Sequence, residues 1–352
     1  MKRVTILLAL SIACGGGQAT MHPDIPLELE SASLPSTHET ALASSAWVSI
    51  RELVVPTRES LPHDPAVAPD RSLWFTEMKA NKLGRLDVTS GHFREFPVRV
   101  ADSGPHGLTI DPAGNVWFTA NQKGYVGKLS PSSGIFTEYP MPDSRAKDPH
   151  TPVLDSHGTL WFTLQESNFV GRLDTTSGHV QLKELASRDS KPYGIVIGKD
   201  ANPYVCEFGA NRIARVDATS MDIREYVLPE GSRPRRIALA PSGMLYYTDY
   251  ARGKLGRLDT TTGAMKEWAS PSGHDARPYA IAATSDGRIW FVETGVSPNR
   301  LGRFDAGSEG FSSAPIPSGG GVVRNMVATP DERLYLACSG TNRVAIAIPR
   351  GE

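Results

Sequence analysis

Polar side chains occupy one recurring position of this 352-residue chain, directly after a proline in six of seven sequence repeats. We call it the inner-strand position. Its residues are His63, His106, His150, Tyr193, Arg235, Tyr279 and, in a repeat that has lost the proline, Asn325. An imidazole has a pKa near neutral and can accept a proton, and a tyrosine hydroxyl can donate a hydrogen bond. This set is therefore suited to binding a small polar molecule.

A second recurring position carries acids in four of the seven repeats. We call it the second-strand position, and its residues are Glu77, Ala120, Leu164, Glu207, Asp249, Glu293 and Cys338. In an antiparallel sheet the start of the first strand and the end of the second strand meet at one edge. We therefore expect both positions at one mouth of a central channel, as ligand contacts. The alternative is that these polar side chains are simply hydrated there.

The elements that carry these positions form a repeat. An aromatic residue recurs at intervals of about 43 residues, at Trp74, Trp117, Trp161, Tyr204, Tyr246, Trp290 and Tyr335. Seven copies at this period indicate one repeat architecture and not two domains. Each copy contains four short strands separated by Gly and Asn turns, with no helical period. The prediction is an all-β, seven-bladed β-propeller of four-stranded antiparallel blades.

The last copy ends after its third strand. The segment Arg51-Glu52-Leu53 matches the outer strands of other copies, such as Arg94-Glu95-Phe96. We therefore expect residues 47–55 to supply the missing strand and close the ring, which hides sheet edges. The propeller domain is then residues 46–352.

The N-terminal segment has the features of an export signal. Lys2 and Arg3 precede an apolar run that is too short to span a membrane, and small residues surround Cys14. The prediction is a signal peptide at residues 1–13, lipidation of Cys14 and a flexible tether at residues 14–45, hence a lipoprotein of the bacterial cell envelope. An ordinary signal peptide with a chance cysteine is the alternative. A formal net charge of −1 argues against nucleic acid as a partner. We expect a monomer that contacts membrane through its lipid anchor alone.

Several strings resemble the streptogramin B lyase (virginiamycin B lyase) family. They are Trp74-Phe75-Thr76-Glu77, Ala80-Asn81-Lys82-Leu83-Gly84-Arg85-Leu86 and Gly104-Pro105-His106-Gly107-Leu108. The resemblance implies a seven-bladed propeller that opens a cyclic depsipeptide at its ester bond by magnesium-assisted C–O elimination. The catalytic positions of the family fall here on His63, Tyr279, Val323, Asn325 and Ser339, and all five residue types differ from the family's.

A rotated placement on the pseudo-symmetric ring preserves a similar set of groups. Blades two to four offer His106, then Asp148-Pro149-His150, then Tyr193. We expect His106 or His150 to act as the base and Tyr193 to donate a hydrogen bond. Asp148 and Glu166 would hold Mg²⁺, which would stabilise the enolate of a small ester or lactone substrate.

Two other functions stay open at this stage. One is a non-catalytic propeller that binds a ligand or partner at the cell envelope. The other is lactone hydrolysis as in calcium-dependent lactonase propellers, for which carboxylates such as Glu77 and Glu207 offer ligands but no matching motif. Metal dependence would separate the enzymes from the binding module.

Overall fold

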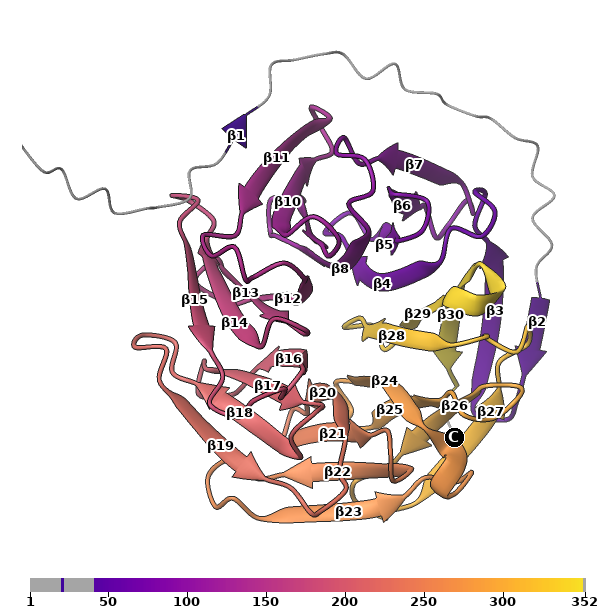
Figure 1. Ribbon diagram of the computed structural model, residues 1–352. Helices are drawn as coiled ribbons and strands as arrows, with labels where there is room; N and C mark the ends of the chain where they lie inside the picture. The colour runs from indigo at the N-terminus through magenta and orange to yellow at the C-terminus, as the bar shows by residue number, and fades with distance from the viewer. Residues whose placement is uncertain (1–19, 22–40, 351–352) are drawn as a thin grey trace, which may run out of the picture.

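The computed structural model describes residues 20–21 and 41–350. Seven antiparallel sheets are arranged around a central axis, and the chain passes through them in sequence order (Figure 1). This confirms the predicted seven-bladed β-propeller. In the described residues, no helix is long and apolar enough to cross a membrane.

The first four blades follow the chain without interruption. Blade 1 contains β4 (Pro62–Val67), β5 (Leu73–Glu77), β6 (Lys82–Leu86) and β7 (Phe93–Pro97). Blade 2 contains β8 (Pro105–Ile110), β9 (Val116–Ala120), β10 (Tyr125–Ser130) and β11 (Ile135–Pro140). Blade 3 contains β12 (Pro149–Leu154), β13 (Thr159–Leu164), β14 (Phe169–Asp174) and β15 (Val180–Glu184). Blade 4 contains β16 (Pro192–Ile197), β17 (Pro203–Glu207), β18 (Arg212–Val216) and β19 (Ile223–Val227).

The remaining blades complete the ring. Blade 5 contains β20 (Pro234–Leu239), β21 (Leu245–Asp249), β22 (Lys254–Leu258) and β23 (Met265–Ala269). Blade 6 contains β24 (Pro278–Ala283), β25 (Ile289–Glu293), β26 (Arg300–Phe304) and β27 (Phe311–Pro315). Blade 7 contains β28 (Val323–Ala328), β29 (Leu334–Cys338), β30 (Arg343–Pro349) and β3 (Val48–Val54). Two short 3-10 turns are η1 (His274–Ala276) and η2 (Ser339–Thr341).

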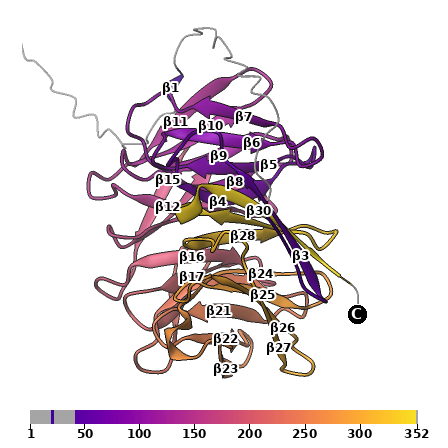
Figure 2. The same ribbon diagram turned by 90° about the vertical axis from the view of Figure 1, so that its right-hand side faces the viewer.

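The two ends of the propeller meet in blade 7, as predicted. Strand β3 pairs with β30 from Val48 opposite Pro349 to Val54 opposite Arg343, and Figure 2 shows the two strands side by side. Outside them, β2 (Ala41–Ser44) pairs with β3, so the last residues of the predicted tether extend this blade. A further short strand, β1 (Thr20–Met21), pairs with β11. Cys14 lies outside the described residues.

The core lies between neighbouring blades. The recurring aromatic residues are almost completely buried; Trp74, for example, packs against the blade 2 residues Val116 and Phe118. Gly84 of the third strand faces the ring of Phe75, which an added Cβ would approach to 2.3 Å. The repeated Gly therefore leaves room for the aromatic layer.

Every inner strand begins with the same irregularity, and this feature positions the site. In blade 1, Pro62 is opposite Glu77 but Pro65 is opposite Phe75, so two residues of β4 face one residue of β5. The same shift occurs at the start of the inner strand in all seven blades. A β-bulge of this kind bends the strand and re-aims its side chains. Both bulge residues are thereby available to the channel.

A threonine of the second strand holds the bulge in four blades. In blade 1 the Thr76 hydroxyl accepts a hydrogen bond from the backbone N–H of Asp64 and donates one to the carbonyl of His106, 2.7 Å away in blade 2. The same bridge is made by Thr119, Thr163 and Thr248. Each bridge fixes one inner-strand residue relative to the next.

Candidate functional site

Three histidines and a tyrosine from blades 1 to 4 form a continuous row of tilted ring contacts at the channel, which we call the histidine stack. The ring centroids of His63 and His106 are 3.8 Å apart, those of His106 and His150 are 3.8 Å apart, and His150 and Tyr193 follow at 4.2 Å. The three predicted catalytic residues therefore lie in contact, although they come from blades that are distant in the sequence.

Burial favours the neutral form of these imidazoles. His63, His106 and His150 are 2%, 6% and 3% exposed. Burial lowers the pKa of His63, with Asp64 acting in the opposite direction. Burial and the neighbouring His63 hold the pKa of His106 well below its usual value, and burial and His106 do the same for His150. A neutral imidazole is the form that can accept a proton.

The hydrogen bonds of the three rings differ. Nδ1 of His63 is 2.9 Å from the Asp64 carboxylate, and Nδ1 of His150 is 2.8 Å from the Thr151 hydroxyl. Nδ1 of His106 is buried and has no hydrogen-bond partner in the described part of the chain. A ring nitrogen without a partner is the one most readily offered to a ligand.

The other side of the ring is aromatic and cationic. The hydroxyls of Tyr193 and Tyr279 are hydrogen-bonded to each other. The guanidinium of Arg235 lies 3.8 Å from the ring centroid of Tyr279 and 4.5 Å from that of Tyr250. Tyr279 is fully buried, and burial together with Tyr193 raises its pKa. These rings hold the Arg235 side chain by cation–π contact.

The inner-strand position of blade 7 is Arg324, one residue before the expected Asn325. Val323 is opposite Cys338, just as Pro278 is opposite Glu293 in blade 6, so Val323 takes the place of the proline. Asn325 is the second bulge residue, and its Oδ1 accepts a hydrogen bond from the backbone of Met326. Because Val323 replaces the proline, the residue that marks this position in the other six blades is missing from blade 7.

A charge pair that the sequence analysis missed crosses the channel. Arg236 of blade 5 lies 2.9 Å from Asp64 of blade 1, and both are almost completely buried. Burial opposes ionisation of Asp64, but Arg236 and His63 outweigh it and lower the pKa of the carboxyl. Arg236 also reaches the Thr151 hydroxyl at 3.4 Å. All three are second bulge residues, where other blades have Gly107, Gly194 and Ala280.

The acids of the second-strand position fall into two pairs: Asp249 and Glu293 are hydrogen-bonded, whereas the carboxylate oxygens of Glu77 and Glu207 are buried without a hydrogen-bond partner among the described residues. Glu293 accepts hydrogen bonds from the backbone N–H and hydroxyl of Ser272, and Asp249 is 2.7 Å from Nε of Arg252. Burial and Glu95 raise the pKa of Glu77 to about 8, and burial and Glu225 do the same for Glu207. None of these contacts involves the histidine stack.

The residues predicted to hold Mg²⁺ do not form a suitable set. Asp148 accepts hydrogen bonds from the backbone N–H groups of Glu166 and Ser167 and from the Ser167 hydroxyl. Burial raises the pKa of Asp148. The Glu166 side chain is 65% exposed and lies 3.3 Å from Lys191. Mg²⁺ takes an octahedron of oxygen ligands in which one or two carboxylates join several waters, whereas Asp148 anchors a turn and Glu166 pairs with a lysine.

Another group of potential metal ligands lies in the stack. Donor atoms of His63, Asp64 and His106 lie within 4.8 Å of one another, and this is the one group of three or more such residues found in the described ranges. The same Asp64 oxygen is already shared by His63 and Arg236. The Arg236 guanidinium, 2.9 Å from the Asp64 carboxylate, would repel a metal cation bound to these three residues.

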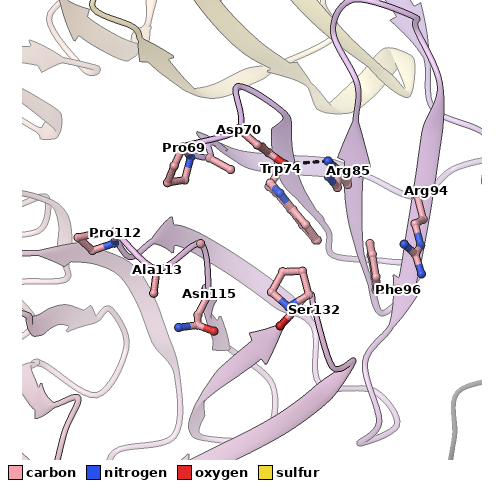
Figure 3. Close-up of a pocket in the computed structure, with 13 residues that line it drawn as sticks. Pro69, Asp70, Trp74, Arg85, Arg94, Phe96, Pro112, Ala113, Asn115 and Ser132 are labelled. Carbon is pink, nitrogen blue, oxygen red and sulfur yellow. Dashed lines mark hydrogen bonds and ion pairs between the residues drawn. The ribbon is translucent and has the colours of Figure 1, made fainter.

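A separate cavity of about 420 Å³ lies between blades 1 and 2, beside the far ends of their inner strands. Trp74, Arg94 and Phe96 line it, and Asp70 pairs with Arg85 at its wall (Figure 3). Because β4 runs from His63 to Val67, this cavity faces the edge of the blades opposite to the histidine stack. It contains none of the predicted site residues.

The propeller sequence matches a known family model. The model of the Virginiamycin B lyase family aligns with residues 44–207 and 179–352, which together span all seven blades. The chain belongs to the virginiamycin B lyase family. No curated protein sequence matches it.

Solved structures of the family superimpose on the propeller. A streptogramin B lyase is 29% identical with a TM-score of 0.80, over 87% of this chain and 100% of its own. Virginiamycin B lyase from Staphylococcus aureus is 26% identical with a TM-score of 0.78, over 85% and 99%. A catalytically inactive variant of that enzyme with quinupristin is 25% identical with a TM-score of 0.77, over 85% and 99%.

The structural register also moves the catalytic positions that the virginiamycin B lyase resemblance implies. In the last repeat the positions expected at Val323 and Asn325 fall on Val322 and Arg324, each one residue earlier, because Val323 takes the place of the proline. His63 and Tyr279 keep their places. This family member therefore has neither an imidazole nor a carboxylate at the implied positions of blade 7.

Proposed function

We propose that the protein is a lyase-type enzyme that acts on a small ester or lactone by C–O elimination at the histidine stack. The observation that carries this proposal is the buried, neutral imidazole of His106 with an unpartnered ring nitrogen. Family membership supports the reaction class. Blade 7 has neither an imidazole nor a carboxylate at the positions that the resemblance implies, which argues for a substrate other than the streptogramins.

The residues of this chain can take complementary parts in such a step. His106, supported by the contacting His150, would accept the proton α to the carbonyl. The C–H electrons would form a carbon–carbon double bond as the C–O bond on the next carbon breaks, releasing a carboxylate. Tyr193, whose ring contacts His150, would donate a hydrogen bond from its hydroxyl to substrate or leaving oxygen, and the Tyr279 hydroxyl would hold it in place.

Positive charge for the developing enolate is available from protein groups. Arg235 lies on the tyrosine side of the ring, and the charge of Arg324 acts on both His63 and His106. Preorganised cations in a dry site stabilise developing negative charge effectively. Because Asp148 and Glu166 do not fit Mg²⁺, no step is assigned to that ion.

Substitution of the two histidines tests the proposal. His106→Gln and His150→Gln should each lower the turnover of a β-acyloxy carbonyl ester by roughly 10²–10⁴-fold, the usual contribution of a general base. The assay follows the absorbance of the unsaturated product, with quinupristin as a second substrate. Glu293→Gln, which lies outside the stack, is the control. Full activity in both histidine variants would exclude the assignment.

The second candidate is a non-catalytic binding propeller, favoured by the near-complete burial of the stack. In that case the wild-type chain would bind small esters without converting them. We also propose export and lipid anchoring through Cys14, which radiolabelled palmitate incorporation in cells, compared with Cys14→Ser, would test.

A further inference from the structure

We infer that Arg235 and Arg324 form an anion site at the channel mouth, which binds the carboxylate group of a small molecule. The inference names the ligand class of the site described above and in that respect rests on the proposed function. It also means that the channel would take an anion and not the Mg²⁺ that the family resemblance implies.

The first argument is position. Arg235 and Arg324 occupy the inner-strand position of blades 5 and 7, on either side of Tyr279 in blade 6. The charges of both act on the Tyr279 hydroxyl. Unlike the histidines, both arginines are only partly buried. The accessible part of the ring is therefore cationic.

The second argument is the lack of counter-ions. Neither Arg235 nor Arg324 forms an ion pair within the described part of the chain, and Nε of each is buried without a hydrogen-bond partner. Nearby, Asp64 is engaged by Arg236. With neutral histidines, three guanidiniums face one carboxylate, which leaves an excess of two positive charges. Partly buried guanidiniums without a counter-ion are stabilised when an anion binds to them.

The third argument is shape. Besides Tyr279, the Arg235 guanidinium faces Tyr250, Tyr193 and Phe208 at 4.5, 4.9 and 5.0 Å. Aromatic contacts hold the planar group, and its Nε has no hydrogen-bond partner among the described residues. A guanidinium pairs with a carboxylate through two parallel hydrogen bonds. A metal ion on His63, Asp64 and His106 is disfavoured, because Arg236 already pairs with the Asp64 carboxylate.

Calorimetric titration of the full chain with benzoate and with its neutral analogue benzamide tests the site. Benzoate should bind at least about tenfold more tightly than benzamide, and Arg324→Gln and Arg235→Gln should each weaken benzoate at least about tenfold. Arg324→Lys should lose less than Arg324→Gln. Arg94→Gln, beside the cavity of Figure 3, is the matched control and should bind benzoate within about twofold of wild type.

Nε of Arg324 has no hydrogen-bond partner among the described residues, so substitution of this side chain should leave the fold intact, and circular dichroism verifies this for each variant. Equal binding of benzoate and benzamide, or benzoate binding that survives both glutamine variants, would overturn the anion site. Loss in Arg94→Gln would place the anion in the other cavity and overturn it as well. Elimination that depends on His106 without benzoate binding would contradict the anion site alone. Benzoate binding without elimination would contradict the lyase alone.

Discussion

The inner-strand and second-strand positions lie at the same edge of each blade, but their side chains contact different groups. A bulge directs His106, His150 and their equivalents to one another across blades, whereas the second-strand acids Asp249 and Glu293 accept hydrogen bonds from the loops that precede their blades. The difference shows that a shared edge does not imply a shared site. The local backbone decides which side chains reach the axis.

The closing strand is the framework that both positions require, and its disruption should have the largest effect. Replacing Val48, Ile50 and Leu53 with alanine should lower the free energy of unfolding by about 6 kcal/mol or more, because all three are buried against blades 6 and 7 or blades 7 and 1. Urea denaturation measures this. Ser49→Ala with Arg51→Ala on the same strand is the control. Similar stability of the two variants would contradict closure by β3.

Disruption of the ion pair between Asp64 and Arg236 should have the second-largest effect on stability. Asp64→Asn leaves Arg236 buried without its carboxylate and should cost about 3–5 kcal/mol of unfolding free energy. Adding Arg236→Met should restore most of that loss, since no charge then remains unpaired. Denaturant unfolding of the two variants gives the comparison. A loss below about 1 kcal/mol in Asp64→Asn would mean that the pair is not formed.

The framework acids should respond to pH. The pKa of Glu77 is raised to about 8 in the folded chain, so between its ordinary value and pH 8 the folded state binds more protons than the unfolded state. Stability from this group is thus fully present below the ordinary carboxyl pKa and is lost as the pH rises through 8.

Glu77→Gln removes this dependence. It should raise the free energy of unfolding by roughly 2–3 kcal/mol at pH 9 and change it little at pH 4. Thermal unfolding at the two pH values measures the effect, with the fully exposed Glu59 as the control site, Glu59→Gln. A variant that is equally affected at both pH values would show that Glu77 is ionised throughout.

The framework was predictable from the sequence, but the site was predictable only in part. The regular spacing of aromatic residues and the Arg51-Glu52-Leu53 string identified the blades and the closing strand. The histidine stack followed from residues that come after the prolines. In blade 7 the proline is absent, and Arg324 could have been found from the constant spacing of 12 residues between the proline position and the aromatic residue.

Other features depend on three-dimensional closure. Asp64 and Arg236 are 172 residues apart and meet because blades 1 and 5 face each other across the axis. The only sign of this pairing in the sequence is that both residues are charged at the second bulge position, where three other blades have glycine or alanine. Asp148 likewise precedes a proline and a histidine, yet its carboxylate accepts hydrogen bonds from the backbone N–H and the hydroxyl of Ser167.

The central claim is that the channel holds three neutral imidazoles beside unpaired guanidiniums. Long-range ¹H–¹⁵N NMR of the histidine rings through an acid titration, assigned with His63→Gln, His106→Gln and His150→Gln, tests it directly. We expect all three rings to take up a proton only below the ordinary histidine pKa, because burial lowers the pKa of each, and we expect benzoate but not benzamide to move their nitrogen shifts. Protonation at or above the ordinary histidine pKa, or identical responses to the two compounds, would contradict the claim.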